Sequence, residues 1–389
     1  MCLFFVYPLE YRDRRKFMKI LITGGAGFIG RHLTCALQKR GHWVRWLDSL
    51  DAQIHGPEAA TDPDYCRQAD EMILGDVRRR RDWQRALRGV DVIIHLAAQT
   101  GTGQSMYRIA YYNDVNVGGT ALLWDILANE RNSVKRVLIA SSRAVYGEGA
   151  YRCQGVCGTV VPEPRSKTQL DKKNWEVCCP LCGGLVQPIA TSEASIPRPA
   201  SMYSCTKLAQ EQMSLTMGKA LCIPTIACRF QNVFGPGQSL RNPYTGIISI
   251  FSNQLRQNLP INVYEDGNES RDFVFVEDVA EICAQAMEWD CESAVVNGGS
   301  GHQTRMIDLA NDLHRLWNST SKISITGDFR VGDIRHNWAD MTQLLRLYPN
   351  WHPMNLKQGL KKYVYWAQGQ AVYMDQTRRA KEELKKRNL

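Results

Sequence analysis

The chain has 389 residues, of which 44% are hydrophobic and 22% are charged, as in an ordinary folded protein. This composition argues against a disordered, collagen-like or coiled-coil chain. The sequence contains no run of 18 apolar residues, which argues against a membrane-spanning helix. The net charge is +9, but residues 10–17 contribute +2 of it and residues 377–389 contribute +4. We therefore expect charged, solvated ends rather than a basic face that binds nucleic acid.

Short apolar runs alternate with amphipathic segments along the first 230 residues. Residues 18–23 form an apolar run that ends in glycines, which is typical of a buried parallel strand. We expect further strands at 42–48, 71–74, 91–97, 136–142 and 225–230, with helices at 27–40, 82–88, 115–130 and 203–220. This alternation predicts an α/β fold with a doubly wound parallel sheet of the Rossmann type.

After about residue 230, turn-forming residue pairs become frequent and the predicted elements become shorter. Asn-Pro, Gly-Pro and Asp-Gly pairs mark loops between shorter elements, which indicates a smaller C-terminal domain that supplies a substrate pocket. The predicted organisation is an N-terminal extension (1–17), an NAD-binding domain (18–229), an interleaved substrate-binding domain (230–371) and a charged tail (372–389). The extension places apolar residues before basic ones, the reverse of a secretory signal, so we expect a reducing, cytoplasmic location.

A glycine-rich loop, TGGAGFIG at residues 23–30, follows the first predicted strand. Glycine permits the tight turn and lets backbone N–H groups approach a pyrophosphate. Asp48 ends the next strand 18 residues after Gly30, where a carboxylate binds an adenosine ribose and repels a 2′-phosphate. We predict NAD as the cofactor, the alternative being a glycine-rich turn without a ligand. The contacts expected from this part of the chain are Gly24, Gly27, Phe28, Ile29, Gly30, Asp48, Asp76 and Val77.

Three polar residues form a candidate catalytic set. Tyr203 and Lys207 are four residues apart on a predicted helix, so they share one face. A nearby ammonium lowers the pKa of a phenol, so that Tyr203 could act as a base near neutral pH. Ser142 ends a predicted strand at the carboxyl edge of the sheet, where its hydroxyl could bond the same substrate oxygen. The plain alternative is a surface tyrosine–lysine pair.

These motifs together resemble the extended short-chain dehydrogenase/reductase family. The resemblance rests on the segments TGGAGFIG, HLAA, NVGGT, SSRAVYG, YSCTK, RFQNVFGPG and RDFVFVEDVA, and it runs from Met18 to about residue 366. Within the family the chain is similar to NAD-dependent nucleotide-sugar epimerases. The segments RNPYTG, YEDGNESRDF and VGDIRH more narrowly resemble dTDP-L-rhamnose 4-epimerases.

The resemblance implies a nucleotide-sugar 4-epimerase that oxidises C4 transiently with tightly held NAD. It makes Ser142, Tyr203 and Lys207 the catalytic triad, and Tyr203 and Lys207 would also contact the cofactor. It adds the cofactor contacts Leu96, Ala97, Ala98 and Asn116. It places Arg143 near the sugar and makes Asn232, Arg271, Arg330 and Asp333 the residues of the substrate diphosphate pocket. It also implies a homodimer formed through the helices near 115–130 and 203–220.

Two positions depart from the family pattern. Enzymes that dehydrate sugars carry an Asp-Glu pair directly after the catalytic serine or threonine, whereas Arg143 and Ala144 stand here. Dehydration is therefore disfavoured. Gln231 replaces the aromatic residue that commonly precedes the asparagine, and it either bonds a sugar hydroxyl or changes the packing at the nicotinamide. Two alternatives to an epimerase stay open, namely a nucleotide-sugar reductase of the same fold and a catalytically silent NAD-binding protein.

Sixty residues separate Ser142 from Tyr203, and this insertion at about 150–190 contains a cluster of cysteines. Two pairs, Cys153 with Cys157 and Cys179 with Cys182, supply four thiolates at a spacing that suits a tetrahedral structural zinc ion. Cys178 could replace Cys179. We predict a zinc-ribbon-like insertion that serves as a lid or a partner contact, the alternatives being free thiols or a redox switch.

Overall fold

The computed structural model describes residues 17–59, 62, 67–242, 244, 246–289, 291–373, 382–383 and 386–387. The predicted N-terminal extension, apart from Phe17, and most of the predicted charged tail lie outside the described residues. Among the described helices, none has both the length and the apolar character needed to cross a bilayer.

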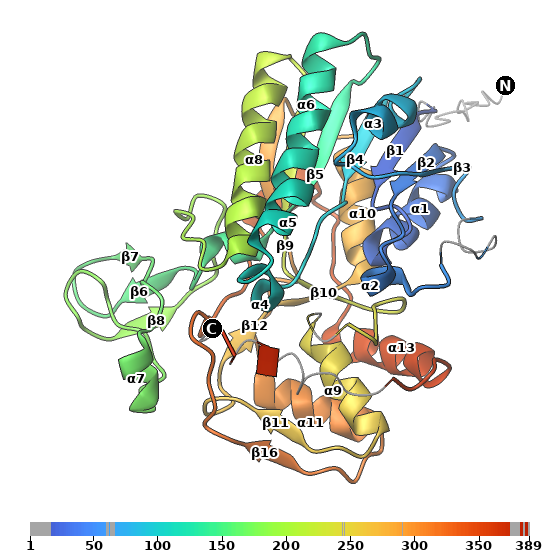
Figure 1. Ribbon diagram of the computed structural model, residues 1–389. Helices are drawn as coiled ribbons and strands as arrows, with labels where there is room; N and C mark the ends of the chain where they lie inside the picture. The colour runs from blue at the N-terminus through green and yellow to red at the C-terminus, as the bar shows by residue number, and fades with distance from the viewer. Residues whose placement is uncertain are drawn as a thin grey trace, which may run out of the picture.

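A seven-stranded parallel sheet forms the centre of the molecule (Figure 1). Its strands in spatial order are β14 (Ser293–Gly298), β9 (Thr225–Phe230), β5 (Arg136–Ser142), β4 (Val92–His95), β1 (Lys19–Thr23), β2 (Trp43–Asp48) and β3 (Glu71–Leu74). The chain runs outward from β1 to β3 and then outward again from β4 to β14. The order therefore reverses between β1 and β4, which is where open α/β sheets bind ligands beyond the carboxyl ends of their strands. The predicted doubly wound α/β fold is confirmed.

Helices cover both faces of this sheet because its central strands are apolar on both sides. In β1, Ile20 and Ile22 pack with α1 (Phe28–Lys39) and α10 (Val276–Ala286) in one core. Leu21 points to the opposite face, in a core with residues of α3 (Arg80–Ala86) and α6 (Gly119–Asn129). Helix α8 (Met202–Ala220) packs on the same face as α6, and the two lie side by side in Figure 1.

The helix expected at 115–130 differs from the prediction at its start. Helix α5 (Ile109–Asn113) runs through a π-helical turn, Asp114–Gly118, into α6. The wider turn places Asn116 on the buried side of the helix, where its side chain is fully covered. Hydrophobic periodicity alone did not reveal this local change of helical pitch.

The C-terminal part contributes both to the main sheet and to a second core. Strand β14 and helix α10 belong to the sheet and its covering layer, although both lie after residue 230. The second core lies between α9 (Ile247–Arg256), α11 (Met306–Leu316) and α13 (Leu356–Gln368). The other elements here are β10 (Asn232–Phe234), β11 (Ile261–Val263), β12 (Ser270–Arg271), β13 (Phe273–Phe275), β15 (Thr304–Arg305), β16 (Ile323–Ile325) and α12 (Thr342–Leu347).

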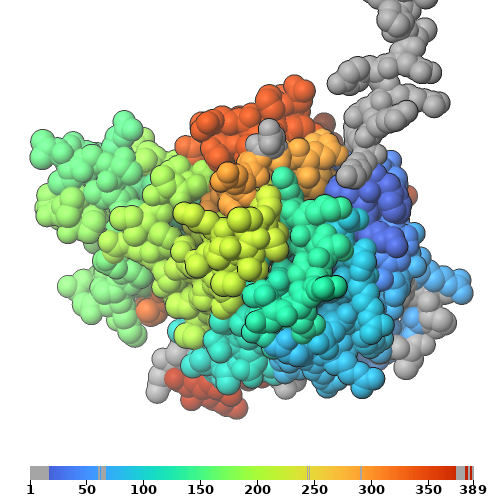
Figure 2. Space-filling model, turned by 90° about the horizontal axis from the view of Figure 1, so that it is seen from above, coloured from blue at the N-terminus to red at the C-terminus, as the bar shows by residue number. Residues whose placement is uncertain are grey.

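Residues 150–190, called the cysteine module below, form a lobe beside the main body (Figures 1 and 2). The lobe contains an antiparallel sheet in the order β7 (Thr159–Val160), β6 (Tyr151–Cys153) and β8 (Val186–Pro188), together with helix α7 (Lys167–Asp171). Its buried apolar cluster consists of Tyr151, Cys153, Val160, Val177 and Cys179. Two of these five residues are cysteines, so thiol groups make up a large share of the module's apolar interior.

Candidate active site

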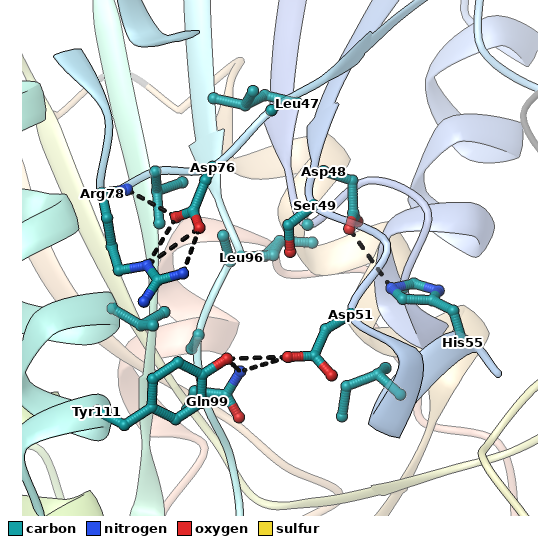
Figure 3. Close-up of a pocket in the computed structure, with 18 residues that line it drawn as sticks. Leu47, Asp48, Ser49, Asp51, His55, Asp76, Arg78, Leu96, Gln99 and Tyr111 are labelled. Carbon is teal, nitrogen blue, oxygen red and sulfur yellow. Dashed lines mark hydrogen bonds and ion pairs between the residues drawn. The ribbon is translucent and has the colours of Figure 1, made fainter. Parts of the chain in front are cut away.

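A pocket opens at the carboxyl ends of β1 to β4, at the point where the strand order reverses (Figure 3). Of the predicted cofactor residues, it is lined by Gly24, Gly27, Asp48, Asp76, Val77, Leu96, Ala97 and Ala98. The short helices α2 (Ala52–His55) and α4 (Thr102–Ser105) belong to the loops that follow β2 and β4. This pocket is not lined by Phe28, Ile29, Gly30, Asn116, Tyr203 or Lys207.

The glycine-rich loop is built without side chains for a steric reason. Gly24 has a φ of +69°, and a Cβ atom there would lie 2.9 Å from the backbone nitrogen of Ala97. A Cβ atom at Gly30 would lie 2.4 Å from the carbonyl oxygen of Gly25. Both contacts are too close for any larger residue, so the loop packs tightly against the end of β4 and leaves its backbone facing the pocket.

Asp48 is held in place at the end of β2. Its carboxylate accepts backbone hydrogen bonds from Ala26 at 3.1 Å and from Leu50 at 2.9 Å. His55 of α2 lies 3.4 Å from the same carboxylate, as Figure 3 shows. A buried, oriented carboxylate at this position suits a ribose diol and disfavours a phosphate in its place.

The sequence analysis missed two hydrogen-bonded sets of polar residues that line the pocket. Arg78 donates a 2.6 Å hydrogen bond to Asp76. Although burial raises the pKa of Asp76, the hydrogen bonds from Arg78 hold it below its usual value. Across the pocket, the Tyr111 hydroxyl donates to Asp51 at 2.9 Å and accepts from Gln99 at 3.0 Å (Figure 3). The residues Asp51, Gln99 and Tyr111 come from three separate loops or helices, and no spacing in the sequence connects them.

Tyr203 and Lys207 lie in the first turns of α8, directly after the capping residue Ser201. The Lys207 ammonium is buried and donates to the carbonyl oxygen of Ala140 at 3.0 Å, on the strand that ends in Ser142. Burial lowers the pKa of Lys207 to about 7. Burial raises the pKa of the Tyr203 phenol, whereas a hydrogen bond with Ser142 and the positive charge of Arg143 lower it. The predicted triad is therefore brought together at the carboxyl edge of the sheet.

Asn116 does not line the pocket, but it bonds both a loop that does and helix α8. Its side-chain oxygen accepts from the backbone N–H of Gln99 at 2.8 Å. Its amide group donates to the Gln99 carbonyl at 3.1 Å and to the Thr206 hydroxyl at 2.9 Å. Because Thr206 precedes Lys207 in α8, Asn116 links the pocket loop to the helix that carries Tyr203 and Lys207.

The predicted substrate residues gather around one segment of the C-terminal part. Arg271 donates to the carbonyl oxygens of Arg335 at 3.1 Å and Ile334 at 2.7 Å, while Asn232 donates to the carbonyl of Asp272 at 3.0 Å. Arg330 lies over the ring of Tyr264, 5.3 Å from its centre. The last two predicted substrate residues, Arg143 and Asp333, interact electrostatically with each other.

Arg143 is half-buried and lies close enough to Tyr203 for its charge to act on the phenol. Burial, and then the charge of Arg271, lower the pKa of Arg143 to about 10, while Asp333 and Tyr203 oppose this change. The structure therefore places Arg143 between the triad and the residues predicted to hold the diphosphate. A guanidinium there favours hydroxyl or anionic groups of a bound substrate.

The four predicted metal ligands converge in the cysteine module. The Sγ atoms of Cys153, Cys157, Cys179 and Cys182 all lie within 4.8 Å of one another, and those of Cys153 and Cys182 are 3.6 Å apart. Zinc–sulfur bonds of about 2.3 Å in a tetrahedron would place the sulfur atoms about 3.8 Å apart. Cys178 is exposed and outside this cluster, and its backbone pairs with Leu185.

The fold and the pocket together define a Rossmann-type protein with a cavity at the point where the strand order reverses. A model of the NAD-dependent epimerase/dehydratase family matches residues 20–167 and 183–298, so the chain belongs to that family. The unmatched residues 168–182 include the second cysteine pair.

Individual relatives narrow the comparison. The chain is 37% identical over 353 residues to dTDP-L-rhamnose 4-epimerase from Burkholderia thailandensis, covering 90% of this chain and 94% of the relative. A UDP-N-acetylglucosamine 4-epimerase from Methanobrevibacter ruminantium, solved with UDP-N-acetylmuramic acid, superposes with a TM-score of 0.73 at 25% identity, covering 92% of this chain and all of that one. The protein MoeE5, solved with UDP-glucuronic acid and NAD, gives a TM-score of 0.71 at 26% identity, covering 90% of this chain and 99% of that one.

Proposed function

We propose that this protein is an NAD-dependent nucleotide-sugar 4-epimerase and that its substrate is dTDP-L-rhamnose or a related dTDP- or UDP-hexose. The observation that carries the proposal is the convergence of Ser142, Tyr203 and Lys207 beside a dinucleotide pocket. The chain that contains this arrangement is 37% identical to a dTDP-L-rhamnose 4-epimerase along nearly its whole length.

The pocket fits NAD on the chemistry of its donors. Gly24 and Gly27 line the pocket without side chains, and Asp48 offers its carboxylate at the end of β2. When bound, NAD supplies a reversible hydride acceptor for C4 of the sugar. Lys207 would hold the nicotinamide ribose, and its positive charge would then favour the phenolate form of Tyr203.

Tyr203 is the residue that accepts and returns the proton. The phenolate accepts the proton of the 4-hydroxyl as the C4–H bond breaks, and it returns that proton when the C4–H bond forms again on the other face. Ser142 donates a hydrogen bond to the same oxygen and stabilises the charge that develops there. Asn232, Arg271 and Arg330 hold the diphosphate, so the hexose can turn about its linkage while the nucleotide stays in place.

The residues after Ser142 favour epimerisation over dehydration. Loss of water from the sugar needs an acid that protonates the departing hydroxyl. Arg143 and Ala144 occupy the positions at which dehydrating members of the family carry Asp and Glu. A guanidinium and a methyl group do not donate a proton at neutral pH. The 4-keto sugar is therefore reduced again rather than dehydrated.

We also assign a structural zinc ion to Cys153, Cys157, Cys179 and Cys182. The support is their mutual approach to within 4.8 Å and the small apolar cluster of the module. Four protein ligands leave no open position for substrate, so this ion would stabilise the fold and not take part in the reaction. A reducing, cytoplasmic location would keep the thiolates available, and a homodimer through α6 and α8 remains our expectation for the assembly.

The test is proton NMR of the purified protein with dTDP-L-rhamnose and no added cofactor. We expect the 4-epimer to appear up to an equilibrium ratio, with Tyr203→Phe inactive but still carrying NAD. If neither dTDP-L-rhamnose nor a UDP-hexose changes, even with added NAD, the epimerase assignment is wrong. Net consumption of a nicotinamide coenzyme would instead identify a reductase, and tight capture of a partner without turnover would indicate a binding protein.

A further inference from the structure

We propose that the cysteine module is a clamp that holds the substrate loop, residues 328–337, in its binding position. This inference rests on the proposed zinc site and on the proposed roles of Arg330 and Asp333, which lie in that loop. It assigns the module to one wall of the nucleotide-sugar site. Zinc binding and nucleotide binding would then be coupled, although the ion does not touch the substrate.

The first arm of the clamp is the ion pair between Glu176 of the module and Arg335 of the loop. Arg335 is 1% exposed and donates to Glu176 at 2.6 and 2.9 Å. The same guanidinium donates to Asp266 at 2.7 and 2.9 Å and to Glu265 at 3.0 Å. Arg335 therefore joins the module to the C-terminal part through one buried side chain.

The second arm is Arg165, which also comes from the module. Its guanidinium donates to the carbonyl oxygen of Asp333 at 2.9 Å and to Glu265 at 2.8 Å. It lies 3.5 Å from Glu148, whose other oxygen accepts the backbone N–H of Arg335 at 2.7 Å. The two arginines thus share Glu265, and Arg165 bonds the main chain of a predicted substrate residue directly.

Aromatic contacts reinforce these two arms along the loop. Trp175 of the module packs against Phe329 with ring centres 6.3 Å apart, next to Arg330. Tyr151 of β6 lies 6.5 Å from the ring of His336. The module therefore contacts the substrate loop near both of its ends and in its middle.

The carboxylates in this region pair with arginine side chains rather than with a metal cation. Glu265, Asp266 and Glu269 have oxygens within 4.8 Å of one another, a spacing that would suit a metal ion. The Arg335 guanidinium, however, already donates to Glu265 and Asp266 and lies 3.9 Å from Glu269. Buried charges of this kind are stable only while they stay paired, and Arg165 of the module supplies one of the two guanidinium groups that pair with Glu265.

In this proposal, the metal-bound cysteines fix the positions of Arg165 and Glu176. Arg165 and Glu176 both lie in the segment between the two cysteine pairs, and Glu176 is three residues before Cys179. The apolar cluster of the module is five residues, and two of them are candidate ligands. Without a metal cross-link the segment would lose its main internal restraint, and the substrate loop would lose the contacts that fix Arg330 and Asp333.

The experiment compares Cys182→Ser with Cys178→Ser in the full-length protein. Both cysteines are exposed and both belong to the second cysteine group, but Cys178 lies outside the cluster. Zinc content is measured by plasma mass spectrometry, retained NAD by absorbance after denaturation, and affinity for dTDP and UDP by calorimetry. We expect the parent and Cys178→Ser to hold one zinc ion, and Cys182→Ser to lose it.

The expected result for Cys182→Ser is nucleoside diphosphate affinity weakened by about tenfold, with bound NAD unchanged. A second variant, Glu176→Gln, should keep its zinc and still weaken diphosphate binding, whereas Asp171→Asn on the exposed face of α7 should match the parent. Loss of zinc with unchanged dTDP and UDP affinity would overturn the clamp. A parent protein that takes up no zinc would overturn both the zinc site and the clamp. Normal zinc coupling without epimerisation would instead refute only the proposed reaction.

Discussion

The side-chain amide of Asn116 donates a 2.9 Å hydrogen bond to the hydroxyl of Thr206, which in turn donates to the carbonyl of Tyr203 at 2.8 Å. A π-helical turn and helix α8 are therefore joined through two buried side chains. The same asparagine bonds the backbone of Gln99 in the loop that lines the cofactor pocket. The position of Tyr203 is thus linked to the wall of the pocket.

Thr206→Val tests this link, because valine keeps the shape of threonine and removes its hydroxyl. The Asn116 amide would lose one of its two acceptors and keep the Gln99 carbonyl, at a cost of roughly 1–3 kcal/mol for the buried N–H left unpaired. We expect kcat to fall about tenfold with bound NAD retained, as measured by steady-state NMR assays and cofactor content. Cys205→Ser, an exposed change on the same helix, is the control. An unchanged kcat would limit Thr206 to a packing role.

Lys207→Met should abolish turnover and yet stabilise the cofactor-free protein. The buried ammonium has its pKa lowered to about 7 by burial, so its charge disfavours the folded state. Because the folded-state pKa lies below the unfolded value, the penalty is full below about pH 7 and fades as the pH rises toward 10. Thermal melts should show the largest increase in Tm at pH 6–7 and a smaller one at pH 9. A lower Tm at pH 6–7 would show that the bond to Ala140 outweighs the burial of the charge.

Arg143→Gln should shift the pH dependence of the reaction. The positive charge of Arg143 lowers the pKa of the Tyr203 phenol, so its removal raises that pKa. The limb of the kcat profile on which the phenolate forms should move to higher pH by roughly 0.5–1 unit. Arg143→Lys keeps the charge and serves as the matched comparison, with a limb close to that of the parent. If both variants shift equally, geometry rather than charge explains the effect.

Gln231→Leu examines a buried amide that is 5% exposed. Neither its oxygen nor its nitrogen has a hydrogen-bond partner within the described part of the chain. An apolar residue of similar shape should therefore stabilise the free protein by roughly 1–2 kcal/mol, which differential scanning calorimetry would detect. We expect the KM for the sugar nucleotide to rise while dTDP affinity stays constant, because the amide would otherwise bond the hexose. An unchanged KM would rule out that contact.

The parts of the site that follow from local sequence were predictable, and those that depend on distant pairing were not. The glycine loop and the strand ends at Asp48 and Ser142 are local patterns, because strand edges and turns are set by neighbouring residues. The bond from Asn116 to Thr206 spans 90 positions and arises from a π-helical turn that apolar periodicity does not reveal. The pairing of Glu176 with Arg335 spans 159 positions, and the charges alone do not identify which partners meet.

The four cysteines that converge were recognisable from spacing because two short pairs are a local pattern. Their place relative to the substrate loop was not, since it depends on where the module packs. Cys178 and Cys179 are adjacent in sequence, and only the structure separates them, by directing Cys179 inward and leaving Cys178 exposed.

The chain enters and leaves the module at two neighbouring points. The Ile189 N–H donates to the Ala150 carbonyl at 3.0 Å, and Tyr151 of β6 pairs with Pro188 of β8. The two ends of the module therefore lie side by side at the edge of the main body, and the residues between them extend far enough to reach Asp333 and Arg335. One short attachment thus carries a segment whose contacts lie in a distant part of the sequence.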